Sequence, residues 1–317
     1  MAVSASAPVQ AGAPVVNRIA LLAILAGAAG IAFAPIFVRL SELGPSATGF
    51  HRIFLSLPVL WLWTELTARS RPGSSGVSAA RTPDKSQWRL VFLVGFFFAG
   101  DIALWHWSIR LTSVANATLL ANFAPVFVAL GAWLLMKEHI TRRFLVALAV
   151  ALGGSVMVMG ASIDLDRQHL IGDLLGILTA VFYAGYILSV KRLRSTMTTA
   201  PLMFWTAIVS AAALLPIALL SGEGLVADSL FGWAVLGGLA LISHCGGQGL
   251  IAYALAHLPA SFSSLTLLLQ PVLAAFLAWG LLAEPLGLLQ SAGGIVVLLG
   301  ILLASRTSAP LAQQLRR

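Results

Sequence analysis

The chain of 317 residues is 59% hydrophobic and only 9% charged, whereas soluble domains carry about 25% charged residues. A water-soluble globule of this composition would expose far too much apolar surface, so the sequence predicts an integral membrane protein. The net charge of +8 does not indicate nucleic-acid binding, because the basic residues lie in short connections between apolar segments.

Ten apolar segments are each long enough to cross a bilayer as a helix, which needs roughly 20 residues. The strand-like alternation expected of an outer-membrane barrel is absent from the sequence. The sequence therefore predicts an all-α integral membrane fold of ten transmembrane helices. The predicted spans are 18–40, 45–69, 88–110, 113–136, 140–160, 171–193, 200–221, 229–256, 259–283 and 287–305.

Basic residues are distributed unevenly among the predicted connections. With a cytoplasmic N-terminus and ten spans, most of the 19 basic residues fall on the cytoplasmic side, and the exceptions are Arg39, Arg52, Arg110 and Arg167. This is the positive-inside pattern of multi-pass membrane proteins. We therefore expect both the N- and C-termini to be cytoplasmic.

One apolar block occurs twice, as APVFVALGAWLLMKE at 124–138 and QPVLAAFLAWGLLAE at 270–284. A shift of 146 positions aligns a proline, a tryptophan and a glutamate in the two copies. Five helices per half is an odd number, so the second half must enter the membrane with opposite polarity, as an inverted-topology repeat. The predicted organisation is a disordered cytoplasmic tail (1–17), a first five-helix repeat (18–160), a second five-helix repeat (171–305) and a cytoplasmic tail (306–317).

Polar side chains deep in the spans are the main candidates for function, because a polar group in hydrocarbon costs several kcal/mol unless it faces a cavity or a partner. Asp101 and Trp105 share one face of the third span, and His244 and Gln248 share one face of the eighth. The Asp101 carboxylate can bind an ammonium group or exchange a proton, and His244 can accept a proton near neutral pH. The alternative is a structural hydrogen bond between Asp101 and His244. The glycines beside His244 permit close helix packing or a local break.

Amides precede prolines in the fourth and ninth spans. Asn122 lies before Pro125 and Gln270 lies before Pro271, and each proline can kink its helix by removing a backbone hydrogen bond. Such amides can bind the carboxylate and amine of an amino acid, or they can simply join helices to one another. Tyr183, deep in the sixth span, can stack on a planar substrate.

Arg52 lies early in the second span, near the expected external face. We expect it to pair with Asp173 or Glu42, or to form an exit gate. The motifs GxxxxGK[ST], HExxH, CxxC and GxSxG are absent, so the sequence predicts no ATPase, no cofactor and no metal site. Transport energy is expected to come from a gradient.

Several of these features resemble the EamA-type drug/metabolite transporter superfamily. They are the five-plus-five inverted helices, the segment GDLLGILTAVFYAGYILSVKRL at 172–193, the two Pro-to-Glu blocks and Arg52, and the likeness runs from about 18 to 305. The resemblance implies a secondary transporter in the bacterial inner (plasma) membrane that exports small metabolites by alternating access around a central site. The subgroup most similar to this chain exports aromatic amino acids. The segment AGIAFAPIFVRL at 29–40 departs from the common pattern, which has an asparagine there.

The sequence thus predicts an exporter of small metabolites, with aromatic amino acids as the first candidates and organic cations or drugs as the alternative. A distant alternative is an intramembrane enzyme that uses Asp101 with His106 or His244. The predicted partners are a small-molecule substrate and the lipid bilayer, without nucleic acid; the oligomeric state is left open and a monomer is plausible. The predicted substrate-binding residues are Asp101, Trp105, Asn122, Tyr183, His244, Gln248 and Gln270, with Asp101 and His244 as candidates for proton coupling.

Overall fold

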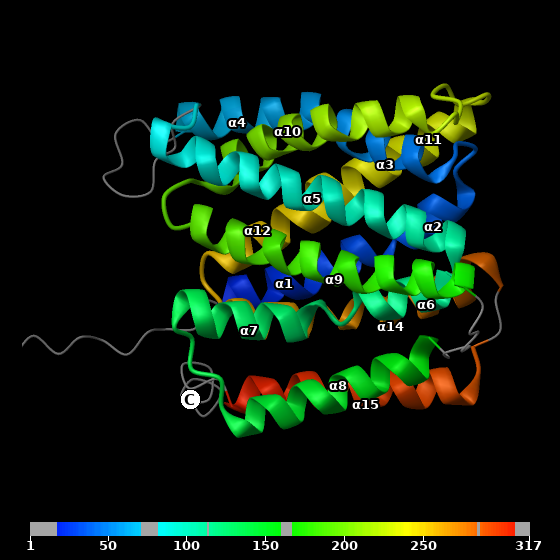
Figure 1. Cartoon of the computed structure of the whole chain (residues 1–317). Helices are drawn as coiled ribbons and strands as arrows, with labels where there is room; N and C mark the ends of the chain where they lie inside the picture. The colour runs from blue at the N-terminus through cyan, green and yellow to red at the C-terminus, as the bar shows by residue number, and fades with distance from the viewer. Residues whose placement is uncertain (1–17, 71–81, 113, 160–166, 284–285, 308–317) are drawn as a thin grey trace, which may run out of the picture.

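The structure is a computed structural model that describes residues 18–70, 82–112, 114–159, 167–283 and 286–307. These residues form α-helices and one π-helix, and the helices run roughly along one common direction (Figure 1). The predicted tail 1–17, Glu284 and residues 308–317 of the predicted C-terminal tail lie outside the described residues.

The helices of the first half are α1 (Arg18–Ala32), α2 (Ala34–Leu40), α3 (Pro45–Phe54), α4 (Leu57–Ser70), α5 (Lys85–Leu111), α6 (Val114–Ala121), α7 (Ala124–Met136) and α8 (Arg142–Met159). Those of the second half are α9 (Arg167–Leu193), α10 (Thr199–Leu220), α11 (Leu230–Gly238), the π-helix η1 (Leu239–Gln248), α12 (Gly249–Leu255), α13 (Ala260–Thr266), α14 (Leu269–Leu282) and α15 (Leu288–Thr307).

Nine helical segments in the described part of the chain are long and apolar enough to cross a membrane. They correspond to nine of the ten predicted spans. The predicted span 45–69 is not among the nine; it consists of α3 and α4 with a break at Leu55 and Ser56. The polar side chains of His51, Arg52 and Glu65 lower the hydropathy of this pair.

Kinks were expected at Pro125 and Pro271, and the structure has a break in the helix just before each of them. Between α6 and α7 the chain turns at Asn122 and Phe123, and Pro125 follows in the first turn of α7. Between α13 and α14 it turns at Leu267 and Leu268, and Pro271 follows. Proline fits the first turn of a helix because the N–H that it lacks has no partner there. Both broken helices therefore expose backbone and amide groups in mid-span.

The ends of these two helices also correspond. Lys137 after α7 has the left-handed angles φ 55° and ψ 31°, and Ala283 after α14 has φ 53° and ψ 29°. Their N–H groups donate to the carbonyls of Ala132 and Ala278, respectively. The shift of 146 positions relates Lys137 to Ala283 and Ala132 to Ala278. The left-handed conformation recurs at both sites although it is unfavourable for residues other than glycine. The duplicated block thus adopts the same local structure twice.

Helices α8 and α15 pack side by side along one edge of the molecule (Figure 1). A Cβ atom on Gly154 would lie 2.6 Å from the backbone nitrogen of Val297, and one on Gly300 would lie 2.7 Å from the backbone nitrogen of Ala151. The shift of 146 relates Gly154 to Gly300 and Ala151 to Val297, so the contact is reciprocal. Small residues permit this close approach of two helix backbones.

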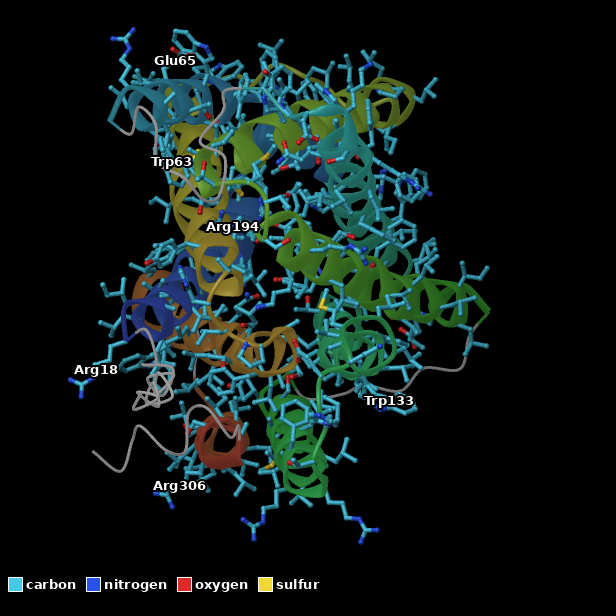
Figure 2. The ribbon with its side chains drawn as sticks, turned by 90° about the vertical axis from the view of Figure 1, so that its left-hand side faces the viewer. Arg18, Trp63, Glu65, Trp133, Arg194 and Arg306 are labelled. Atoms are coloured by element: carbon cyan, nitrogen blue, oxygen red, sulfur yellow. The ribbon has the colours of Figure 1, made fainter. Side chains whose placement is uncertain are left out.

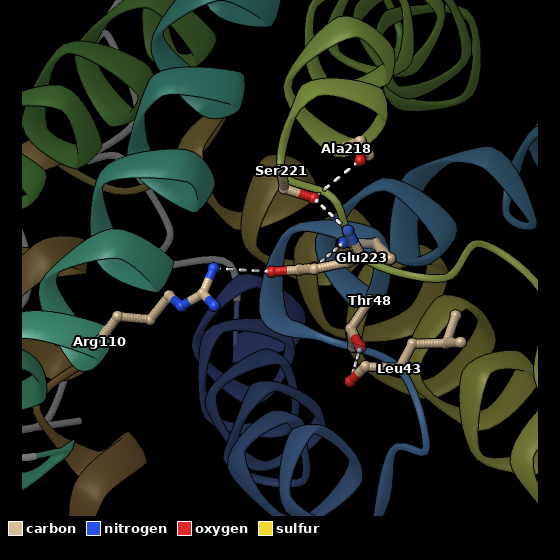
Figure 3. A network of polar contacts seen from close by, with 7 residues as sticks. Leu43, Thr48, Arg110, Ala218, Ser221 and Glu223 are labelled. Carbon is tan, nitrogen blue, oxygen red and sulfur yellow. Dashed lines mark hydrogen bonds and ion pairs between the residues drawn. The ribbon is translucent and has the colours of Figure 1, made fainter.

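Acidic side chains join elements at the end of the bundle that carries the connections α2–α3 and α10–α11. Glu223 accepts a hydrogen bond from the backbone N–H of Ala47 (2.9 Å) and pairs with Nη1 of Arg110 (3.2 Å), which links α3, α5 and the segment after α10 (Figure 3). Glu42 accepts hydrogen bonds from the Ser229 hydroxyl and from the N–H of Asp228 (2.9 Å). The hydrogen bond from Ser229 lowers the pKa of the Glu42 carboxyl, so Glu42 stays ionised.

Basic side chains gather at the opposite end, where Arg18 and Arg306 project outward (Figure 2). At this end Glu138 accepts hydrogen bonds from the N–H of Ala260 (2.8 Å) and from the hydroxyl of Ser261 (2.7 Å). Because Ala260 and Ser261 begin α13, the carboxylate of the first half caps a helix of the second half.

The adjacent glycines of α8 provide a test of the α8–α15 contact. Gly154→Ala places a methyl group against the backbone of α15, whereas Gly153 is exposed and has nothing within 4 Å of an added Cβ. We expect Gly154→Ala to destabilise the protein by about 1–3 kcal/mol through overpacking. Gly153→Ala should leave stability unchanged or slightly higher, because alanine favours the helix. Thermal unfolding of both variants in detergent measures the difference, and equal melting temperatures would contradict this packing.

Candidate functional site

A cavity of about 470 Å³ lies inside the bundle. Its size falls within the range of roughly 300–1,000 Å³ that is typical of small-molecule sites. Both halves of the chain contribute to its walls, which are mainly apolar with a few polar side chains. Its lining comes from α1, α2, α3, α5, α6, α7, α8, α9, η1, α13, α14 and α15 and from the turns between them.

Six of the seven predicted site residues line this cavity, namely Asp101, Trp105, Asn122, Tyr183, Gln248 and Gln270. They come from α5, the α6–α7 turn, α9, η1 and α14, in both halves of the chain, and are brought together by the fold. The cavity is therefore the place where any joint action of these side chains must occur.

An amide side chain at each of the two helix breaks, Asn122 or Gln270, lines the cavity. Asn122 donates from Nδ2 to the carbonyl of Thr118 (2.9 Å), near the end of α6. Gln270 has a buried Nε2 without a hydrogen-bond partner, although the Tyr183 hydroxyl is a close polar neighbour. Buried polar groups are nearly always hydrogen-bonded, so Nε2 of Gln270 is the kind of donor for which a partner in the cavity would be expected.

The π-helix η1 positions Gln248. Its wider turns are rare and occur often at functional sites. The π-helix η1 packs closely against α1. A Cβ atom on Gly30 would lie 3.0 Å from Cα of Gly247, and the Ser243 hydroxyl donates a hydrogen bond to the Gly30 carbonyl (3.0 Å). The predicted close packing and the local departure from α-helix thus occur together. At the end of η1, Gln248 accepts a hydrogen bond from the Tyr186 hydroxyl (3.2 Å).

His244 differs from the sequence prediction, because it is not among the residues that line the cavity. Its ring is buried and stacks on Phe98, with 5.3 Å between the ring centroids, and Phe98 itself lines the cavity. Neither ring nitrogen of His244 has a hydrogen-bond partner among the described residues, so the alternative structural bond to Asp101 is also not formed. His244 lies in η1, whose wider turns differ from the α-helical spacing that predicted a face shared with Gln248.

Arg52 also lies elsewhere than expected. It lines the cavity, its guanidinium lies 5.9 Å from the centroid of the Phe98 ring, and its buried Nε has no hydrogen-bond partner. The expected partners are engaged with other groups: Asp173 accepts a hydrogen bond from the Thr112 hydroxyl (2.8 Å), and Glu42 binds the segment before α11. The helix starts at Pro45, so seven residues at a rise of about 1.5 Å carry Arg52 about 10 Å inward.

Aromatic rings form part of the cavity wall. Tyr183 stacks on Tyr186 with 5.9 Å between centroids, and Tyr186 packs on Phe98 at 4.7 Å. Trp105 lies beside His106, at 5.2 Å, and both line the cavity. This arrangement offers ring faces to a planar or cationic group.

The cavity extends from the middle of the bundle toward one end only. Its lining reaches Met159, the last residue of α8, and Gln290, near the start of α15, which is the end away from Arg18 and Arg306. On the other side of Tyr186 the space is filled by apolar side chains with little or no exposure. These are Ile187, Leu193, Leu255, Phe262 and Leu265.

Among the side chains that the structure describes, no three His, Cys, Asp or Glu residues gather in a way that could hold a metal ion. The polar groups of the cavity instead suit an organic ligand with charged and aromatic parts.

The sequence of this chain matches a protein family and several known proteins. The EamA-like transporter family matches residues 18–160 and 170–306. The pseudopaline exporter CntI of Pseudomonas aeruginosa is 27% identical over 218 residues, which cover 68% of this chain and 72% of CntI. An uncharacterized transporter of Archaeoglobus fulgidus is 29% identical over 224 residues, which cover 71% of this chain and 77% of the relative.

The fold is shared with a protein of known crystal structure. The TM-score is 0.74 at 17% sequence identity, and the match covers 93% of this chain and 98% of the other. At this identity the likeness concerns the fold alone.

Cysteine labelling tests whether the cavity is open to water. In a background where Cys245 is replaced by alanine, Ala121→Cys places a thiol on the cavity lining, whereas Ala180→Cys places one in the fully buried part of α9. We expect a hydrophilic maleimide to modify the purified, folded Ala121→Cys variant readily and the Ala180→Cys variant only after denaturation. Equal protection of both thiols would contradict a water-filled cavity.

Proposed function

This chain belongs to the EamA-like transporter family, and we propose that it exports small metabolites, with aromatic amino acids first, from the bacterial cytoplasm. It is a multi-pass membrane transporter, as its family and its relatives are. The observation that carries the proposal is the cavity shared by both halves, which holds Asp101 together with amides and aromatic rings.

The proposed topology has ten spans arranged as an inverted repeat, with both chain ends in the cytoplasm. Three features support it: the paired helix breaks, the left-handed caps at Lys137 and Ala283, and the reciprocal α8–α15 contact. The family also matches the chain twice, once in each half. The excess of basic residues at the end of Arg18 and Arg306 supports a cytoplasmic location for that end, in an inner (plasma) membrane.

Each of the six predicted site residues that line the cavity has a chemical task in this proposal. The Asp101 carboxylate binds the ammonium group of the cargo, and the rings of Trp105 and Tyr183 contact its aromatic side chain. The amides of Asn122, Gln248 and Gln270 orient its polar groups. Gln270 supports this assignment, because its buried Nε2 lies on the cavity beside the Tyr183 hydroxyl without a well-formed hydrogen bond.

The alternative cargo, a permanent organic cation, fits the cavity less well. Arg52 lines the same space as Asp101, and its positive charge would repel a cation inside a low-dielectric wall. A relative that exports pseudopaline supports the export of small metabolites as a class, and it does not define the cargo of this chain.

Alternating access follows from the shape of the cavity. It reaches one end of the bundle, whereas packed apolar side chains close it toward the end of Arg18 and Arg306. Rocking of the two halves about the site would open the closed side and close the open one. We assign proton exchange to Asp101, which lines the cavity, and not to His244, which lies behind Phe98.

Transport by the purified protein in liposomes tests this proposal. We expect accumulation of labelled phenylalanine to follow an imposed pH gradient. Asp101→Asn should reduce gradient-driven transport by about tenfold or more, because a hydrogen bond to a charged group contributes about 1.5–3 kcal/mol.

The exposed Asp228 provides the matched control, and Asp228→Asn should transport like the unmodified protein. Absence of phenylalanine, tyrosine and tryptophan transport under every gradient would refute the proposed cargo. Transport at a rate indifferent to pH would refute only the proton coupling.

A further inference from the structure

Arg52 is a charged cavity residue to which the proposed function assigns no task. We propose that its guanidinium binds the carboxylate of the cargo, so that the substrates are zwitterionic α-amino acids and not the corresponding amines. This inference rests on the proposed function of the cavity and narrows its substrate class.

The hydrogen-bonding state of Arg52 is the first argument. A guanidinium has five N–H donors, and a charged group inside a membrane protein is costly unless those donors and its charge are satisfied. Nε of Arg52 is buried without a partner, and the guanidinium lies 5.9 Å from the centroid of the Phe98 ring, which cannot accept a bidentate pair of hydrogen bonds. A carboxylate matches the planar guanidinium fork and would satisfy two donors at once.

The second argument is that the carboxylates expected to pair with Arg52 are engaged with other groups. Asp173 accepts a hydrogen bond from the Thr112 hydroxyl, and Glu42 accepts one from the Ser229 hydroxyl. Among the described residues, the acidic group that lines the cavity is Asp101, whose charge interacts with that of Arg52. The cavity thus presents one positive and one negative side chain.

The third argument is chemical complementarity. An α-amino acid carries its carboxylate and its ammonium group on the same carbon atom. Arg52 and Asp101, on the neighbouring helices α3 and α5, can each take one of these groups. Gln270 and His106 add a buried Nε2 and a buried Nδ1 that have no hydrogen-bond partners. An amine without a carboxylate would leave the charge of Arg52 uncompensated.

The test compares ligands that share one ring and differ in their charged groups. Phenylalanine, phenethylamine and 3-phenylpropionate are titrated into the purified protein, and binding is read from tryptophan fluorescence, since Trp105 lines the cavity. We expect phenylalanine to bind at least about tenfold more tightly than phenethylamine, because a charge-assisted pair of hydrogen bonds is lost with the carboxylate.

Substitution of Arg52 should abolish this preference selectively. Arg52→Gln should reduce the affinity for phenylalanine by about tenfold or more and leave that for phenethylamine unchanged or higher. Arg52→Lys keeps the charge but not the planar fork of donors, so its affinity for phenylalanine should lie between those of the unmodified protein and Arg52→Gln. Arg89→Gln, which removes an exposed arginine in the first turns of α5, is the matched control and should alter neither affinity.

Several results would overturn the inference. One is equal binding of phenylalanine and phenethylamine by the unmodified protein, a comparison that holds even if Arg52→Gln fails to fold. Another is equal weakening of both ligands in Arg52→Gln with recovery in the double variant with Asp101→Asn, which would make Arg52 only a counter-ion of Asp101.

The same design separates this inference from the proposed cargo. If aromatic amino acids do not bind, the pairs leucine and 3-methylbutylamine, and lysine and 1,5-diaminopentane, replace them, since each amine is the amino acid without its carboxylate. A preference for the α-amino acid that depends on Arg52 would then support the carboxylate site and refute the aromatic cargo. No binding by any amino acid would refute both.

Discussion

Hydrocarbon cannot hydrogen-bond, and this constraint explains where the polar groups of the chain lie. Many polar side chains of the spans bond to helix backbone, as Ser263 and Thr266 do, or line the cavity, as Asp101 and Asn122 do, whereas His244 and Ser155 do neither. The few buried polar atoms without a partner are therefore informative. Arg52 and Gln270 carry such atoms and face the same cavity, where a polar ligand can supply what lipid cannot.

The two halves of the chain each bring polar groups to the cavity, away from lipid. Each half contributes one broken helix, and the two breaks meet at the cavity with their amides Asn122 and Gln270. The reciprocal contact of Gly154 and Gly300 with the facing helix holds the α8–α15 pair together outside the site. Glu138 then links the halves at the basic end by capping α13. In the proposed alternating access, such interactions between the halves would form and break together.

Apolar length predicted nine of the ten spans among the described residues, and proline marked the two places where kinks were expected and breaks occur, because both are local signals. The sequence did not predict the division of the span 45–69, where charged and aromatic residues are mixed, nor the π-helix, which packs against α1. The same limits apply to the site. Six residues could be brought together by their depth in the spans, whereas His244 stacks on Phe98 from within the π-helix and Arg52 lies on a helix that enters the bundle further than expected. Depth counted from the start of α3 is the signal that would have identified Arg52.

The central claim is that a polar cavity between two related halves binds a zwitterionic amino acid. An experimental structure determined with phenylalanine present tests it most directly. We expect density for the amino acid in the cavity, with its carboxylate at Arg52, its ammonium group at Asp101 and its ring among Trp105 and Tyr183. Density for phenylalanine outside this cavity, or side chains of Arg52 and Asp101 that close on each other and exclude the ligand, would contradict it.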